Sequence, residues 1–290
     1  MELTADFVRA TLPVRDPMGH KGTFGKVYCL CGSVGFTGAP VFAGRAAMRM
    51  GSGLVYLGVP ERAWSVVAAK CDEVMAFPLP DTGEGKLSLR AEETVRSAMA
   101  PCDAVLMGCG LGRSAETDEL SRRLLDIPQP LVLDADGINA LAGHIDELRR
   151  RRGKITVLTP HEGEFARIGD LTAGREVSAA AFARDHGVYL VLKGHRTVIA
   201  APDGRLAVNP TGNSGMAKGG SGDILSGMAV SLLGQGAEPF AACCAAVYLH
   251  GLAGDLAARD RTERCMTPSD LLERIPDAVR EIEKRYPQSI

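Results

Sequence analysis

A glycine-rich stretch near the C-terminal third of the chain carries the strongest sign of chemistry. It reads NPTGNSGMAKGGSGDI at residues 209–224 and ends in GGSGD, after which an apolar helical pattern begins. Glycines at a helix start let bare backbone approach a ligand where unpaired N–H groups and the helix dipole favour an anion. The stretch therefore predicts a phosphoryl-transfer site, with Gly220 and Gly222 lining the anion site and Asp223 accepting a proton from a substrate hydroxyl.

An N-terminal helix cap is the alternative role for Asp223, and it is the more common one for an aspartate at a helix start. A cap needs one acceptor, however, and does not need several glycines beside it, two of them adjacent. We therefore favour the anion site.

Two further glycine-rich loops follow strand-like apolar runs. They read CGSVGFTGAP at residues 31–40 and GCGLG at residues 108–112. In an open parallel sheet, ligands bind beyond the carboxyl ends of the strands, which is where these loops would lie. Either loop by itself could simply make a tight turn, and neither has the Walker pattern or the full dinucleotide fingerprint.

The elements that must position these loops form an alternating α/β pattern. Short apolar runs alternate with helical stretches, which predicts a mainly parallel sheet with helices on both faces. A hairpin at 197–208 and helices near 218–233, 239–259 and 268–284 follow, and no linker divides the chain, so we expect one domain over residues 1–290. The predicted strands are residues 26–31, 54–59, 73–77, 104–107, 131–133, 155–158 and 188–192.

The charge balance excludes a general attraction to nucleic acid or anionic membrane. Lysine and arginine number 33, aspartate and glutamate 35, and the net charge is −2. The basic cluster from Arg149 to Arg152, followed by Lys154, is expected to be a solvated helix end. The sequence shows no secretion signal and no uncharged apolar run long enough to span a membrane, so we expect a soluble cytoplasmic protein with no nucleic-acid and no membrane partner.

The eight cysteines are expected to be reduced core residues. Most lie inside apolar segments of a chain far longer than a small disulfide-stapled scaffold, and their spacing does not match a zinc site.

The ordered set of motifs resembles the ADP/ATP-dependent NAD(P)H-hydrate dehydratases, members of the ribokinase-like superfamily. The resemblance runs from about residue 22 to residue 257 and implies a ribokinase-like α/β fold. It rests on GFTGAP at 35–40, the loop at 108–112, LDADGINAL at 133–141, TPHEGE at 159–164, and KGHRT at 193–197 with the glycine-rich stretch.

The resemblance implies repair of reduced nicotinamide cofactors that have taken up water, the 6S hydrates of NADH and NADPH. A nucleotide, ADP or ATP, phosphorylates the new ring hydroxyl, and loss of phosphate restores NADH or NADPH. Mg²⁺ is the implied cofactor. The sequence leaves open which nucleotide and which hydrate are preferred.

By the same similarity, most of the implied contacts fall on the glycine-rich loops and strand ends. The hydrated cofactor would contact Ala39, Gly110, His161 and Asp223. Glu164 would hold Mg²⁺ through water. Asp134, Asp136 and Asn139 are expected to shape the same pocket. The nucleotide would contact Lys193, Gly194, His195, Arg196, Thr197, Asn213 and Gly222.

Three of these assignments have structural alternatives. The KGHRT segment could be a charged turn into the hairpin, His161 could be a structural partner at a helix start, and Glu164 could complement a helix dipole. The chain also departs from the family pattern, because Cys109 and Glu162 stand where proline is common, which puts loop rigidity in doubt.

Many relatives carry an N-terminal epimerase domain, for which this sequence leaves no room before its first motif. We expect a stand-alone form, a homo-oligomer, tetrameric by the resemblance, and a separate epimerase as functional partner.

Rival functions remain open from sequence. A kinase of the same fold, acting on a hydroxymethylpyrimidine or hydroxyethylthiazole, would share the anion site and the base but accumulate a phosphorylated alcohol. A non-catalytic nucleotide-binding protein is expected to have lost Asp223. A hydride-transferring dehydrogenase is disfavoured, since the first glycine loop lacks the required fingerprint.

Overall fold

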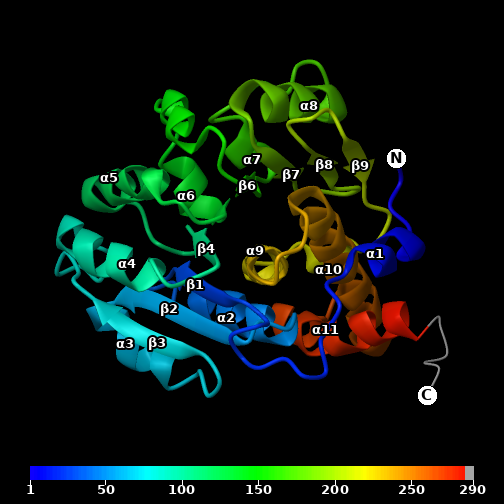
Figure 1. Cartoon of the computed structure of the whole chain (residues 1–290), viewed down its shortest axis with the longest axis horizontal. Coiled ribbons are helices and arrows are strands. Elements are labelled where there is room, and N and C mark those ends of the chain that lie inside the picture. The colour runs from blue at the N-terminus through cyan, green and yellow to red at the C-terminus, as the bar shows by residue number, and fades with distance from the viewer. Residues whose placement is uncertain (285–290) are drawn as a thin grey trace.

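Nine strands form one twisted sheet in the computed structural model, which describes residues 1–284 (Figure 1). The strand order is β3-β2-β1-β4-β5-β6-β7-β8-β9. The neighbours from β3 to β7 pair in parallel, and β8 and β9 add an antiparallel hairpin at one edge. The strands are β1 (Lys26–Leu30), β2 (Leu54–Pro60), β3 (Met75–Leu79), β4 (Ala104–Met107), β5 (Leu131–Leu133), β6 (Thr156–Leu158), β7 (Tyr189–Leu192), β8 (Val198–Ala200) and β9 (Leu206–Val208).

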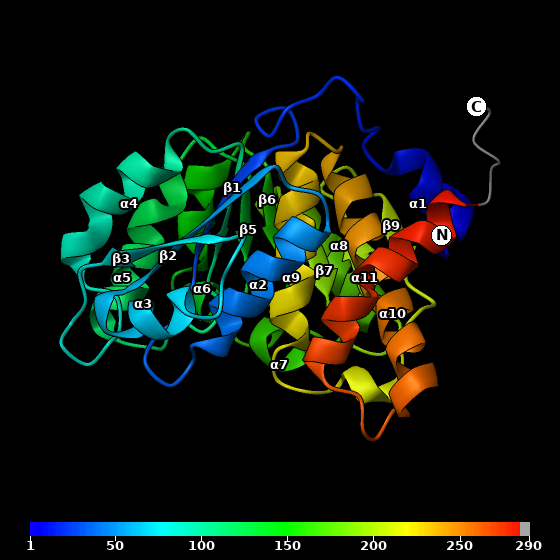
Figure 2. The same ribbon diagram turned by 90° about the horizontal axis from the view of Figure 1, so that it is seen from below.

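Helices cover both faces of the sheet, so the central strands are apolar throughout (Figure 2). One face carries α1 (Ala5–Thr11), α2 (Gly38–Arg49), α3 (Glu61–Ala68), α9 (Ser221–Gly234), α10 (Pro239–Arg261) and α11 (Pro268–Glu283). The other carries α4 (Glu92–Met99), α5 (Ala115–Arg123), α6 (Ala135–Asn139), α7 (Glu162–Phe165) and α8 (Arg175–His186).

Helix α9 is the central helix of its layer and is buried from Ile224 to its end. Its closest approach to α2 is at Gly227, where a Cβ atom would lie 2.2 Å from the Ala43 carbonyl oxygen. Glycine is required here because any side chain would push the two helices apart. The first turn of α9 is therefore held rigidly over the sheet.

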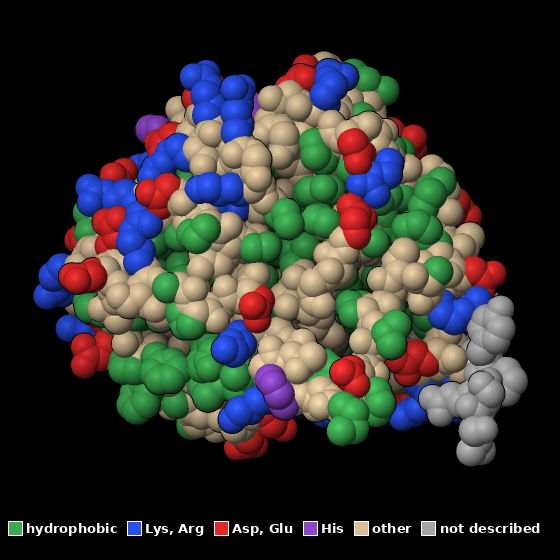
Figure 3. Space-filling model, viewed as in Figure 1, with side chains coloured by type: hydrophobic (Ala, Val, Ile, Leu, Met, Phe, Trp, Pro, Cys, Tyr) green, Lys and Arg blue, Asp and Glu red, His purple; other side chains and the backbone are tan. Residues whose placement is uncertain are grey.

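Helix α10 has the length and composition of a membrane span, but 78% of its most apolar window is buried within the protein. It packs against α9 and α11 and is a core helix. On the outside, basic and acidic side chains are interspersed over the face shown in Figure 3.

The strand order places a topological switch point at β1. The chain moves outward from β1 to β2 and β3, then returns to the other side of β1 as β4. The loops after β1 and β4 therefore lead to opposite faces of the sheet at its carboxyl edge, the position where open α/β sheets bind ligands.

The predicted strands, hairpin and C-terminal helices are confirmed, with ends shifted by up to three residues. The mainly parallel sheet with helices on both faces is likewise confirmed. Helix α9 begins at Ser221 and not at Lys218, because Gly220 has φ +108° and cannot continue a right-handed helix backwards.

The prediction for the basic cluster is wrong at Arg151. Arg149 and Arg150 pair with acids near the surface, but the Arg151 side chain is 1% exposed. It ends the short 3-10 helix Ile145–Arg151, whose turn directs the guanidinium inward beneath the sheet edge. Hydropathy cannot foresee this placement, since the pocket is lined by backbone oxygens.

The Arg151 guanidinium binds the ends of three segments together. It donates to the Thr156 hydroxyl at 2.9 Å and to the Gln129 and Ile155 carbonyl oxygens at 2.8 Å each. The carbonyl oxygens of Leu125 and Ile127 accept further bonds. Burial lowers the pKa of Arg151 to about 10, so the group stays charged at neutral pH.

We expect Arg151→Met to lower the free energy of unfolding by about 3 kcal/mol or more, because it leaves several buried carbonyl oxygens without donors. Urea denaturation measures the change. Arg152→Ala, at an exposed neighbour, is the matched control and is expected to stay within about 0.5 kcal/mol of the parent. Equal unfolding midpoints for the two variants would contradict this role for Arg151.

Candidate active site

The N-terminus of α9 is built from the glycine-rich stretch and has no side-chain cap among the described residues. Gly220 is the N-cap, and a Cβ atom there would lie 2.8 Å from the Phe42 ring, in addition to the strain of φ +108°. Asp223 is the third residue of the helix and not its cap. The first turn therefore presents backbone N–H groups at a helix dipole, the arrangement that binds anions.

A buried histidine from α10 fixes this turn in place. His250 Nε2 lies 2.9 Å from the Ser221 carbonyl oxygen, which can only accept, so Nε2 carries the proton. Burial lowers the pKa of His250 to about 4, and the ring is neutral in the physiological range. His250 thus contributes a hydrogen bond to the turn without placing a second charge there.

Asp134 lies beneath the turn as a permanently ionised carboxylate. Its Oδ1 accepts from Lys193 Nζ and Thr159 Oγ1 at 2.8 Å each, and its Oδ2 accepts from Ser226 Oγ at 2.9 Å. Burial opposes its ionisation, but the Lys193 charge and these hydrogen bonds outweigh burial and hold its pKa below the usual range. These contacts join segments after β5, β6 and β7 to α9.

The Lys193 ammonium occupies the space between Asp134, Glu164 and the first turn of α9. It lies 3.7 Å from Glu164 Oε2. Burial would lower its pKa, but Asp134 and Glu164 raise it above the ordinary value, so Lys193 is cationic. A Cβ atom on Gly222 would come within 3.3 Å of Nζ, which places this charge directly beside the anion-binding turn.

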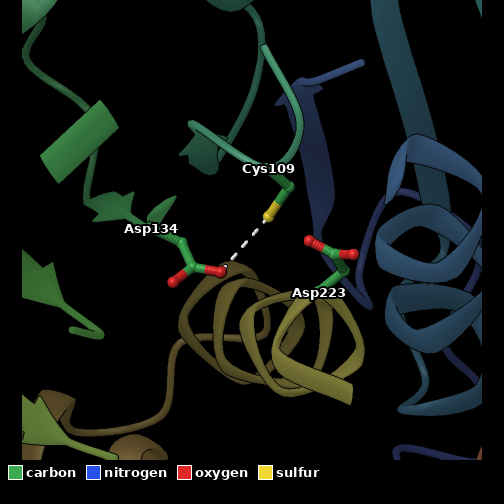
Figure 4. Close-up of side chains that lie close together, drawn as sticks. All are labelled: Cys109, Asp134 and Asp223. Carbon is green, nitrogen blue, oxygen red and sulfur yellow. Dashed lines mark hydrogen bonds between the residues drawn. The ribbon is translucent and has the colours of Figure 1, made fainter. Parts of the chain in front are cut away.

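Asp223 is the carboxyl group that titrates near neutrality. Burial raises its pKa from 3.8 to about 7, and the Asp134 charge adds to the effect. One side-chain ligand atom from each of Asp223, Asp134 and Cys109 lies within 4.8 Å of the others, and Figure 4 shows the Cys109 sulfur between the two carboxylates. A carboxyl group with this pKa can accept a proton at neutral pH and return it.

The loops after β1 and β4 bring Ala39 and Gly110 together. A Cβ atom on Gly110 would lie 2.8 Å from the Ala39 methyl group, so the loop after β4 approaches the start of α2 closely. Ser33 Oγ donates to the Gly110 carbonyl oxygen at 2.9 Å and ties the two loops. The predicted pair therefore lies together where the loops after β1 and β4 meet, and both side chains there are small.

His161 and Glu164 form a capping box at the start of α7. Glu164 accepts from the His161 N–H at 2.8 Å, and His161 Nδ1 accepts from the Glu164 N–H at 3.1 Å. The His161 side chain is 57% exposed whereas that of Glu164 is 8% exposed. The capping role explains how the imidazole is oriented, and its exposed edge remains open to a ligand.

The rest of the KGHRT segment makes the turn into the hairpin. The Arg196 guanidinium pairs with Glu2 at 2.6 Å, and Thr197 Oγ1 donates to the Gly194 carbonyl oxygen at 3.0 Å. The His195 carbonyl oxygen accepts from Arg175 at 2.6 Å. Only Lys193 of this segment extends its charge toward α9 in the described contacts.

Asn213, Asp136 and Asn139 make hydrogen bonds that join their loops to neighbouring elements. The Asn213 amide donates to Asp255 at 2.9 Å and accepts from the Gly215 N–H at 3.0 Å, beside a cavity of about 420 Å³ at the end of α10. Asp136 accepts from the Gly112 N–H at 2.9 Å and from the Asn139 amide at 3.2 Å. These residues shape the glycine loops.

Sequence reasoning missed Thr159, Ser226 and His250. Thr159 stands inside the motif at 159–164 and Ser226 two residues after the glycine-rich stretch, but nothing in the sequence indicates what either hydroxyl contacts. Their common contact, Asp134, lies 25 and 92 residues away along the chain.

The donor set determines how a magnesium ion could bind. Cys109, Asp134 and Asp223 lie close enough to share a metal, but a thiol is a soft ligand, and three protein groups already occupy Asp134. Mg²⁺ prefers few carboxylates together with water and phosphate oxygens. Glu164 is not one of these three groups. Its Oε1 takes no part in the backbone cap and fits a contact with Mg²⁺ through water.

Comparison with known proteins agrees with this geometry. Bifunctional NAD(P)H-hydrate repair enzyme Nnr from Moorella thermoacetica is 44% identical over 288 residues, which cover 97% of this chain and 54% of that protein. The chain thus spans about half the length of this relative.

Solved structures show the same fold. The ADP/ATP-dependent NAD(P)H-hydrate dehydratase from Bacillus subtilis, co-crystallised with ATP and Mg²⁺, matches with a TM-score of 0.82 and 32% identity, over 97% of this chain and 98% of that one. A ribokinase-like superfamily protein from Enterococcus faecalis matches with a TM-score of 0.82 and 25% identity, over 97% and 95%. The predicted ribokinase-like α/β fold is confirmed.

The family model described as NAD(P)H-hydrate dehydratase matches residues 27–277, which is most of the chain and includes every loop of the candidate site. The chain belongs to the NAD(P)H-hydrate dehydratase family.

Proposed function

We propose that this protein uses ADP or ATP to dehydrate the 6S hydrates of NADH and NADPH and so restores the reduced cofactors. The observation that carries the proposal is Asp223, a carboxyl group with a pKa of about 7 in the first turn of an uncapped helix and next to the Lys193 cation. A base, an anion site and a cation meet there, as phosphoryl transfer to an alcohol requires.

In the proposed reaction, Asp223 accepts the proton of the ring hydroxyl while the hydroxyl oxygen attacks the terminal phosphorus of the nucleotide. The bond from that phosphorus to its bridging oxygen breaks, leaving AMP or ADP. The electron pair of the ring nitrogen then expels phosphate by breaking the carbon–oxygen bond. The departing phosphate takes up the proton that the adjacent ring carbon loses, which restores the dihydronicotinamide.

The nucleotide side is assigned to Lys193 through Thr197, Gly222 and Asn213. The α9 N–H groups and the Lys193 ammonium stabilise the charge on the transferred group, which supplies most of the acceleration in this type of reaction. Mg²⁺, when bound with the nucleotide, neutralises phosphate charge, and Glu164 would hold it through water. Ala39, Gly110, His161 and Asp223 face the hydrate.

The proposal extends to a cytoplasmic location and a homo-oligomeric assembly. The eight free thiols support a reducing compartment. Light scattering on the purified protein tests the assembly and distinguishes a tetramer from a smaller form.

Replacing Asp223 by Asn is expected to lower turnover about 10²–10⁴-fold, the usual contribution of a general base, and to change nucleotide affinity only slightly. The assay contains hydrated NADH, Mg²⁺ and ADP or ATP, and follows both the absorbance of reduced nicotinamide and the release of phosphate. A wild-type protein that accumulates a phosphorylated alcohol without phosphate release would point to a kinase. Equal negligible rates in both proteins, with nucleotide bound, would point to a non-catalytic binding protein.

Activity is expected to rise with pH through about 7, because Asp223 must lose its proton to act as base and its pKa is raised to that value. In the pH profile of kcat/KM, the rate would fall about tenfold per unit below this point. The folded protein also holds a proton on Asp223 between about pH 4 and 7 that the unfolded chain releases, so this group's contribution to stability decreases as pH rises over that window. Both effects disappear in Asp223→Asn, and an unchanged acidic limb in the residual activity of that variant would contradict the assignment.

Gly222→Ala is expected to weaken nucleotide binding by at least several-fold while leaving the thermal midpoint nearly unchanged. Gly222 has a helical conformation without positive φ, and the added methyl group would meet only the Lys193 ammonium, at 3.3 Å, and Asp134, at 4.0 Å. Gly220→Ala is the contrasting variant, because φ +108° and the Phe42 ring make it destabilising as well. Unaltered affinity in Gly222→Ala, measured by calorimetry with ADP, would place the phosphates elsewhere.

A further inference from the structure

Cys109 lies at the centre of the site although the reaction written above does not use it. It lies in the loop after β4, and its side chain is fully buried. Its Sγ donates to Asp134 Oδ2 at 3.5 Å, and the same sulfur lies within 4.8 Å of an Asp223 oxygen (Figure 4). The thiol therefore donates to one carboxylate and has a second one nearby.

The thiol stays protonated in this position. A hydrogen bond with Cys31, burial, and the charges of Asp134 and Asp223 all raise the pKa of Cys109 well above its ordinary value. Cys109 is thus a neutral donor and not a nucleophile, because a reactive cysteine needs a lowered pKa.

Asp134 and Asp223 differ in how many other hydrogen-bond donors they have besides the Cys109 thiol. Asp134 accepts from Lys193, Thr159 and Ser226 and is satisfied without Cys109. Burial and the Asp134 charge raise the pKa of Asp223, and the nearby Cys109 thiol is the largest effect that lowers it. The thiol therefore matters more to Asp223 than to Asp134.

The charges that face Asp223 come from several elements. Asp134 after β5 and Glu164 of α7 oppose ionisation, while Lys193 after β7 favours it. Cys31 after β1 contacts the thiol and is itself buried. Two fixed anions against one cation leave the pocket negative, so an ionised Asp223 depends on a neutral donor.

We propose that Cys109 is a positioning residue for the base: its S–H group donates to the ionised Asp223 carboxylate and holds it toward the substrate hydroxyl, and it turns to Asp134 once Asp223 has taken up the proton. The part of this inference that concerns the substrate hydroxyl rests on the proposed function. The part that places the thiol near two carboxylates rests on the structure alone. No bond to sulfur forms or breaks, and the thiol keeps its proton throughout.

The test compares Cys109→Ala and Cys109→Ser with the parent in the pH profile of kcat/KM for hydrated NADH. In Cys109→Ala, the acidic limb is expected to move to higher pH by about half a unit to one unit, because a donor to the ionised form is lost. Turnover at neutral pH would fall several-fold, and KM for ADP would stay constant. Cys109→Ser, which restores a donor, is expected to bring the limb back toward the parent.

Cys102→Ala is the matched control, since Cys102 is also a buried thiol but donates to the Ala98 carbonyl oxygen outside the site. Its acidic limb is expected to coincide with that of the parent. A fall in turnover for Cys109→Ala with no movement of the limb, or a Cys109→Ser profile equal to that of Cys109→Ala, would overturn the proposal.

A second measurement separates this inference from the proposed function. In the substrate-free protein, NMR of isotope-labelled aspartate carboxyl groups gives the titration of Asp223, identified by its absence in Asp223→Asn. An upward shift of that titration in Cys109→Ala supports the hydrogen bond even if hydrated NADH proves not to be the substrate. An unshifted titration refutes it even if the protein restores NADH.

Discussion

The buried contact between Asp134 and Lys193 is the interaction on which the rest of the site depends. It joins the ends of β5 and β7 at 2.8 Å, and Thr159 and Ser226 extend it to β6 and α9. The Asp134 charge helps to keep the pKa of Asp223 near neutrality, and the Lys193 charge lies beside Gly222. One ion pair thus adds to the effect of burial on the pKa of Asp223, the proposed base, and places a cation beside the proposed anion site.

A buried ion pair of this kind contributes little to the free energy of unfolding. Removing two charges from water costs several kcal/mol, and their attraction often no more than offsets that cost. Its value here is electrostatic and geometric, because the pair gives the site fixed charges that need no rearrangement during reaction. The apolar contacts of α9 with α2 and the sheet, with Gly227 against Ala43, supply the rigidity that the pair needs.

The sequence predicted the sheet well because parallel strands covered on both faces are largely apolar, and β4 and β5 are apolar along their whole length. The glycines before α9 pointed to Asp223, whereas Ala39 and Gly110 were named from the family resemblance, and the roles of all three stay predictions. The burial of Arg151 and the meeting of Asp134 with Ser226 were not, since carbonyl-lined pockets and contacts over 92 residues leave no periodic pattern. Cys109 was visible only as a departure from a family pattern, and its place between two carboxylates required coordinates.

The same geometry explains how a kinase fold can support a dehydration. Up to the transfer of phosphate to an alcohol, both reactions require a base, an anion site and a cation, and all three converge on the first turn of α9. The later loss of phosphate draws its electrons from the ring nitrogen of the substrate, so it asks no further catalytic group of the protein. Under the proposed function, the two activities differ in whether a hydrated nicotinamide ring is bound near the loops after β1 and β4, where Ala39 and Gly110 keep the side chains small.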